Sequence, residues 1–155
     1  MRALCLALGL GAALLCTGCL APSGRRPGVT LHGEEVAALP ADWSFTDQYR
    51  EIELEAHALL LDHAVTIWCS AVEGGLYVGA RSPESKRWTK LVVRDPDVRL
   101  SIADRIYEVT LSPVDDPYLA ERVRDAYARK YQLPAPKDPA SAPSMRYWRV
   151  LPRAR

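Results

Sequence analysis

Residues 64–80 read AVTIWCSAVEGGLYVGA, and this stretch decides the fold expected of the chain. Residues 64–72 are mostly apolar, which is typical of a strand whose two faces are both covered. Glu73, Gly74 and Gly75 then allow the positive backbone angles that a tight hairpin needs. Residues 76–80 should therefore return as a second strand, antiparallel to the first.

Alternating apolar side chains predict further strands on both sides of this hairpin. Residues 51–56 read EIELEA, a period of two that buries one face and leaves the glutamates on the wet face. Residues 98–102 and 107–111 show the same alternation around a turn at Ala103 and Asp104. Residues 145–151, rich in aromatic and basic side chains, are expected to form a final strand.

Two segments change to a helical period. Trp88, Leu91 and Val92 lie at i, i+3 and i+4, and Asp95-Pro96 ends that short helix because a residue before proline is pushed out of the helical region. A longer helix begins with Asp116 as N-cap and Pro117 at its first position. Its apolar stripe consists of Leu119, Val123, Ala126, Tyr127 and Tyr131. Antiparallel hairpins interrupted by helices indicate an α+β domain built around a small antiparallel barrel.

Length and charge limit the classes of function. The 155 residues suffice for one compact domain with a core of its own. The 20 Lys and Arg nearly balance the 19 Asp and Glu, so no overall field attracts nucleic acid, and any charge-based function must be local.

The N-terminus is typical of a bacterial lipoprotein. Residues 1–18 have the short apolar core of an export signal, and the small residues before Cys19 resemble a lipobox, in which that cysteine is acylated. Residues 19–41 would then be the lipidated cysteine and a flexible tether, and residues 42–155 the folded domain. We expect the protein in the cell envelope, held on the membrane by lipid and facing the periplasm or the cell exterior. An ordinary secretory signal and an uncleaved anchor are the alternatives, and both also place the domain outside the cytoplasm.

The remaining candidate groups predict no catalytic side chain. Loss of the signal and acylation of Cys19 leave Cys69 as the single thiol, in a segment whose spacing places it in the core. His57 and His63 flank Asp62 at a spacing that suits no metal pair, so no metal site is expected. Hydrolase, zinc-peptidase, P-loop and thiol-redox motifs do not occur in the sequence.

A family resemblance rests on the order of these pieces. Val65-Thr66-Ile67-Trp68, then Leu76-Tyr77-Val78, then Ser85-Lys86-Arg87-Trp88 and finally Arg94-Asp95-Pro96-Asp97-Val98 resemble the FMN-binding split-barrel superfamily. This group includes pyridoxamine-phosphate-oxidase-like proteins and deazaflavin-dependent reductases. The resemblance covers residues 43–131 and the final strand. It implies a small antiparallel split β-barrel with two or three helices.

The resemblance also implies a cofactor site. In that superfamily the strand after the first hairpin and the helix that follows present Ser, Arg and Lys to the cofactor phosphate, a chemistry that guanidinium groups and helix N-termini suit. The pocket of related proteins lies across a dimer interface, which makes a homodimer an expectation. The positions carried over are Arg81, Ser82, Lys86, Arg87 and Lys90 for the phosphate, with Trp68 and Trp88 flanking the ring.

Other interpretations of the same residues stay open. The acidic stretch 51–55 stands where oxidases of the family carry an Arg-x-x-Thr segment, so FMN, a deazaflavin, another ring-bearing ligand or no cofactor all fit. A solvated helix face explains Lys86, Arg87 and Lys90, and Trp88 can simply pack in the core. The basic residues near the C-terminus, Arg146 among them, are typical of charge that protects a strand edge, with anionic lipid or a ligand as the alternative contact.

Two functions follow from these observations. The first is a lipid-anchored envelope protein with a flavin-binding split barrel that supports a redox reaction on a small molecule. The second is a cofactor-free envelope lipoprotein whose barrel binds a small ligand or a partner.

Overall fold

The computed structural model describes residues 30–134 and 143–153. The predicted signal peptide, Cys19 and most of the predicted tether lie outside the described residues. Within them, neither helix is both long and apolar enough to span a membrane.

The elements are β1 Glu34–Glu35, η1 Ser44–Gln48, β2 Ile52–Ala56, β3 His63–Ile67, β4 Cys69–Val72, β5 Gly75–Arg81, η2 Pro83–Ser85, α1 Arg87–Arg94, β6 Asp97–Ile102, β7 Arg105–Pro113, α2 Pro117–Tyr131 and β8 Met145–Pro152.

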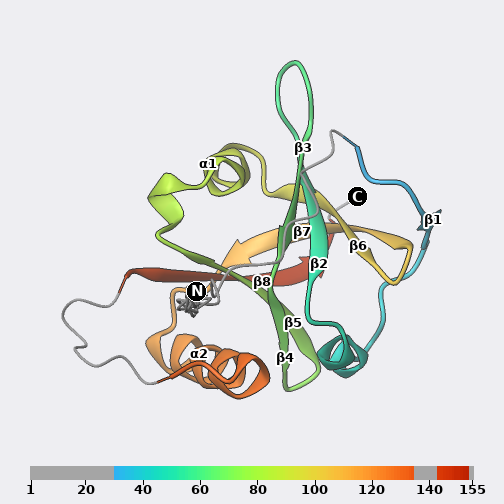
Figure 1. Cartoon of the computed structure of the whole chain (residues 1–155). Coiled ribbons are helices and arrows are strands. Elements are labelled where there is room, and N and C mark those ends of the chain that lie inside the picture. The colour runs from blue at the N-terminus through green and yellow to red at the C-terminus, as the bar shows by residue number, and fades with distance from the viewer. Residues whose placement is uncertain (1–29, 135–142, 154–155) are drawn as a thin grey trace, which may run out of the picture.

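The strands form one sheet that curls into an almost closed barrel (Figure 1). Their order is β3-β2-β6-β7-β8-β5-β4, with all neighbours antiparallel, and the short β1 pairs parallel to β7 at the side. The two ends of this order, β3 and β4, follow each other in the chain with Trp68 alone between them. The sheet must therefore bend back on itself, which confirms the predicted α+β split barrel.

The prediction of one continuous strand over residues 64–72 was wrong, because the strand breaks at Trp68. Its first part pairs with β2 and its second part with β5. Helix α2 holds the break: the Trp68 ring stacks on Tyr131 at 4.2 Å between centroids, and the Tyr127 hydroxyl donates to the Trp68 carbonyl at 2.9 Å. The hairpin prediction is confirmed, with φ of 50° at Glu73 and 77° at Gly74.

The second correction concerns the acidic strand β2. Its alternation places Ile52 and Leu54 in the core as expected, but Glu55 is also buried rather than wet. Its carboxylate accepts from the Arg99 guanidinium at 3.0 Å and from the backbone N–H of Leu31. Glu55 therefore fastens the incoming N-terminal segment to the sheet.

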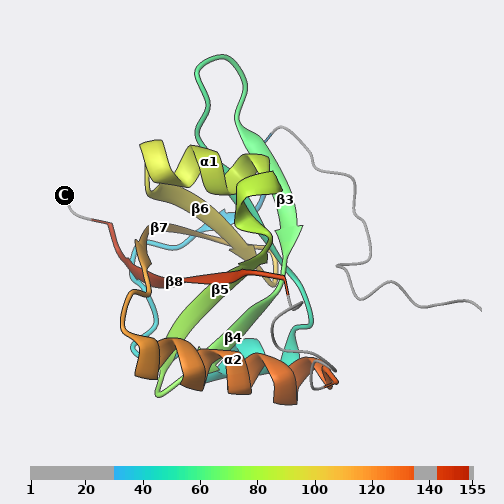
Figure 2. The ribbon, with the colours of Figure 1, turned by 90° about the vertical axis from the view of Figure 1, so that its left-hand side faces the viewer.

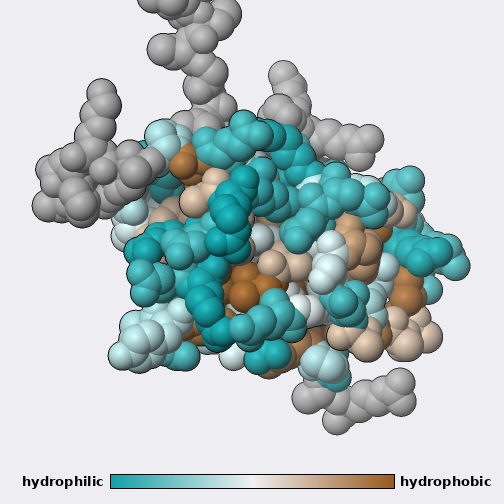
Figure 3. Space-filling view, turned by 90° about the horizontal axis from the view of Figure 1, so that it is seen from below, coloured by the Kyte–Doolittle hydropathy of each residue, from teal (hydrophilic) through white to brown (hydrophobic). Residues whose placement is uncertain are grey.

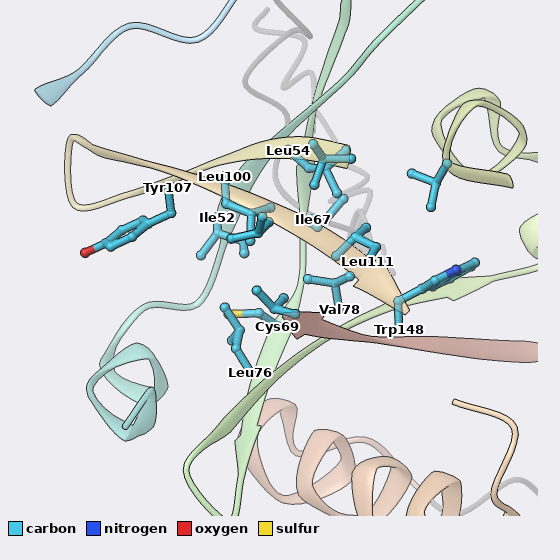
Figure 4. Close-up of a cluster of buried hydrophobic side chains, with 14 of the residues drawn as sticks. Ile52, Leu54, Ile67, Cys69, Leu76, Val78, Leu100, Tyr107, Leu111 and Trp148 are labelled. Atoms are coloured by element: carbon cyan, nitrogen blue, oxygen red, sulfur yellow. The ribbon is translucent and has the colours of Figure 1, made fainter. Parts of the chain in front are cut away.

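Two main apolar clusters, and a third of only three residues, form the core of the described part of the chain. The larger lies inside the barrel, where Leu54, Leu76, Leu100 and Trp148 meet (Figure 4). Cys69 belongs to this cluster and has no exposed surface, as predicted. The smaller cluster packs under α2 and consists of Tyr77, Val123, Tyr127, Tyr131 and Tyr147.

The two helices lie at opposite ends of the barrel (Figures 1 and 2). Helix α1 packs near β2 and β3, and α2 packs on β4. Both helix predictions are confirmed. The Asp116 side chain caps α2 by accepting from the backbone N–H of Tyr118 at 3.0 Å, and Gln132 ends that helix in the left-handed region.

Candidate functional site

The candidate site lies where β5 turns into α1. Ser82 follows the strand with φ of 50°, and its backbone N–H donates to the Ser144 carbonyl at 2.8 Å. The buried Thr89 hydroxyl contacts the carbonyls of Lys86, at 2.8 Å, and Pro83. These bonds hold η2 against the first turn of α1 and fix the backbone from which the basic side chains project.

The N-terminus of α1 has no side-chain cap. Lys86 occupies the N-cap position, where it supplies no acceptor, and the first turn contains no acidic residue. The N–H groups of a first helical turn have no partner within the helix, and the helix dipole makes this end positive. An anion could therefore bind where a capping oxygen is missing.

Four exposed cations lie within six positions of the first residue of α1 in the chain: Arg81, Lys86, Arg87 and Lys90. None of the salt bridges formed between described residues involves them. The field of Arg87 reaches β3: burial first, and the Arg87 charge second, lower the pKa of His63. The structure thus leaves these basic side chains exposed near the start of α1 and without a salt bridge to another described residue.

A further cation was not assigned to this site from the sequence. Arg146 of β8 stands opposite Ala80 in the strand register, and its guanidinium lies 5.8 Å from the centroid of the Trp148 ring, which itself packs on Trp88 of α1. Sixty-six positions separate Ala80 from Arg146 along the chain, so only the pairing of β5 with β8 places Arg146 beside the helix.

The two tryptophans predicted to flank a ring lie in different clusters. Trp88 is 4% exposed and packs on Trp148 at 5.1 Å inside the barrel. Trp68 packs under α2, where its buried Nε1 has no hydrogen-bond partner among the described residues. The structure therefore does not bring Trp68 and Trp88 together within one chain.

Other reactive groups offer no better centre. No group of three metal-ligating side chains occurs in the described part of the chain. Burial raises the pKa of the Cys69 thiol, which keeps it protonated although Lys130 Nζ lies 3.6 Å from its sulfur. A shallow cleft of about 360 Å³ lies between η1 and α2, beside Asp47 and Ser70, and none of the residues that line it is a predicted site residue.

Comparison with solved structures identifies the fold. The fold is the split barrel of a Listeria innocua protein named for pyridoxamine 5'-phosphate oxidase, with a TM-score of 0.54, 16% identity, and coverage of 70% of this chain and 87% of that chain. A conserved hypothetical protein of Mycobacterium tuberculosis has a TM-score of 0.56 at 16% identity, over 71% and 77% of the two chains. A Bacteroides thetaiotaomicron protein named for 5-nitroimidazole antibiotic resistance has a TM-score of 0.53 at 12% identity, over 69% and 75%.

Comparison of the sequence with protein families identifies the family of this chain. Residues 45–147 match the family described as "Uncharacterized protein conserved in bacteria (DUF2255)", and the chain belongs to it. No curated protein matches the sequence.

Proposed function

We propose that this chain is a lipid-anchored protein of the bacterial cell envelope whose split barrel binds a phosphate-bearing flavin or deazaflavin at the start of α1. The observation that carries the proposal is the uncapped helix end. Four exposed cations lie near it in the chain and take part in no salt bridge between described residues: Arg81, Lys86, Arg87 and Lys90. A neighbour of the same fold is named for an oxidase of a phosphate-bearing substrate, which supports the choice of ligand.

The described residues fit the phosphate end of such a cofactor. Guanidinium and ammonium groups would neutralise the phosphate, and the first-turn amides of α1 would donate to its oxygens. The bound ring would supply redox chemistry, while the protein positions it and limits access of water. A second copy of the chain would have to complete the ring pocket, as the family resemblance implies.

Ligand titration tests this function. The chain without its signal, residues 20–155, contains every described element and can be titrated with FMN, FAD and a phosphorylated deazaflavin. Because a charge-assisted hydrogen bond contributes about 1.5–3 kcal/mol, Arg81→Ala or Lys86→Ala should weaken binding about tenfold or more. Arg124→Ala, which removes an exposed arginine of α2, is the matched control and should bind as the parent does.

A second measurement reports on the site without any activity. The positive charge of Arg87 contributes to the lowered pKa of His63, so phosphate bound at Arg87 should raise that pKa. An NMR titration of the His63 ring, with and without FMN, measures the change. A protein that binds none of the three ligands and shows no change at His63 would contradict the flavin function. The burial of Trp88 would then favour the cofactor-free binding module.

The anchor is tested separately. Cys19→Ala in the full chain should release the protein from membranes in cell fractionation. Retention of the variant in the membrane would indicate an uncleaved N-terminal helix instead.

A further inference from the structure

We propose that the loop between β2 and β3 docks on an anionic membrane surface and orients the barrel against it. This leucine loop comprises residues 57–62 and stands clear of the barrel in both ribbon views (Figures 1 and 2). Strand pairing ends with Ala56 opposite His63, so the loop lies beyond the sheet. Leu59, Leu60 and Leu61 are 101%, 90% and 66% exposed.

Contacts at its base close the leucine loop. Asp62 Oδ1 accepts from the backbone N–H of Ala58 at 3.2 Å and lies 3.4 Å from His57 Nδ1. The leucines between these contacts are therefore held away from the core. Three consecutive exposed leucines are unfavourable in water, since burying each would contribute about 1.5–3 kcal/mol. An apolar partner such as the acyl boundary of a bilayer would remove that exposure.

The charge beside the leucine loop suits an anionic surface. Helix α1 packs near β2 and β3, and the charge of Arg87 reaches His63, the first residue after the loop. Arg87, Lys90 and Arg94 follow one another at i, i+3 and i+7, so they share one exposed face of α1. An apolar tip next to a basic helix face matches lipid tails next to anionic headgroups.

The chain enters the domain beside the same loop. Leu31 packs with Ala64 and Ile106, and Ala64 lies two positions after the end of the leucine loop. Cys19 precedes Thr30 by 11 positions, a span of at most about 40 Å. A lipid at Cys19 would thus keep this end of the barrel near the bilayer. This step rests on the proposed anchor, whereas the exposed leucines and the basic face do not.

The opposite end of the barrel differs in character. The face that carries α2 is mostly hydrophilic, with small apolar patches (Figure 3). Its exposed Tyr118 offers a matched control at the far end of the molecule. A contact between two copies through the leucine loop would bring two basic α1 faces together, whereas an anionic membrane neutralises them.

Vesicle flotation tests the docking without the lipid anchor. Residues 20–155 are mixed with phosphatidylglycerol vesicles and with phosphatidylcholine vesicles at low salt. We expect flotation with phosphatidylglycerol that weakens as salt rises. Leu60→Asp should reduce binding about tenfold or more, because it places a charge where a leucine would be buried. Tyr118→Asp should bind as the parent does.

Several results would overturn the proposal. One is a parent protein that does not float with phosphatidylglycerol vesicles, and another is a Leu60→Asp variant that floats with them to the same extent as the parent. A parent dimer that Leu60→Asp converts to a monomer in size-exclusion chromatography would assign the leucine loop to a contact between copies. Circular dichroism of Leu60→Asp checks that this variant is folded. Flavin titration separates the proposals, since Leu60→Asp should keep the flavin affinity that Arg81→Ala loses.

Discussion

Removal of the Tyr131 hydroxyl should destabilise the break between β3 and β4, the point at which the sheet bends back into a barrel. This hydroxyl accepts a hydrogen bond from the backbone N–H of Cys69 at 2.9 Å. As a donor it has two carbonyl oxygens within reach, that of Cys69 at 2.8 Å and that of Arg50 at 2.9 Å. Burial raises the pKa of Tyr131, so the hydroxyl keeps its proton. Tyr131→Phe preserves the stacking on Trp68 and removes only these bonds.

The size of the effect follows from what is left behind. The Cys69 N–H loses its acceptor, and a buried donor without an acceptor costs about 1–3 kcal/mol. Tyr127→Phe is the matched control because its hydroxyl only donates, to the carbonyls of Trp68 at 2.9 Å and Tyr77 at 3.2 Å. Loss of such a donor should cost about 1 kcal/mol.

Urea unfolding of residues 20–155 measures both changes. Tyr131→Phe should lower the unfolding midpoint more than Tyr127→Phe does, with the slope unchanged in each. Faster hydrogen exchange at the Cys69 amide should accompany the first variant. Equal losses of stability in the two variants, or an unchanged Cys69 amide, would refute the view that Tyr131 pins the break.

Three other changes probe the framework around the site. Glu55→Gln should lower the free energy of unfolding, measured with urea, by about 1–3 kcal/mol, because it leaves the Arg99 guanidinium without the buried carboxylate at 3.0 Å. Gly79→Ala should lower the melting temperature, since a Cβ there would lie 2.9 Å from Tyr147 Cδ1 and displace that ring. A hydrogen bond from Thr110 first, and one from Arg153, lower the pKa of Asp97 below its ordinary value of 3.8. The ionised carboxylate of Asp97 therefore stabilises the fold above about pH 4, and this stabilisation is lost as the pH falls further. Urea midpoints measured down that pH range should therefore fall less steeply in Asp97→Asn, and an identical slope would contradict the assignment.

Local patterns predicted the hairpin and both helices because each depends on neighbours in the chain. Glu73 and Gly74 adopt the positive φ that their turn requires, and Asp116 caps α2 within two residues. The basic residues from Arg81 to Lys90 also gather locally, since one turn and one short helix connect them. The exposed basic residues at the start of α1 could therefore be predicted, whereas their contact with a phosphate stays a prediction.

Features that depend on distant partners were not predicted. The apolar run through Trp68 has no signal for a break, because the break arises from α2, some sixty positions later. Glu55 follows the wet-face pattern of its strand, yet β6 places Arg99 opposite it and the N-terminal segment covers it. Trp88 is an exception: its place on the apolar stripe of the short helix allowed a core position, and its burial against Trp148 of β8 confirms it.

The leucine loop shows how register decides what a sequence pattern means. Leu59, Leu60 and Leu61 are apolar residues of the kind most often buried, so a strand running through them would be expected to add them to the core. Pairing of Ala56 with His63 instead leaves residues 57–62 outside the sheet, and the Asp62 contacts with Ala58 and His57 close the loop there. The same register places His63 at the base of the loop, and the packing of α1 near β2 and β3 brings the charge of Arg87 to it. A substitution that shifted the β2–β3 register by one residue would change which residues the loop exposes, which is why the vesicle test uses Leu60, whose side chain lies outside the paired residues.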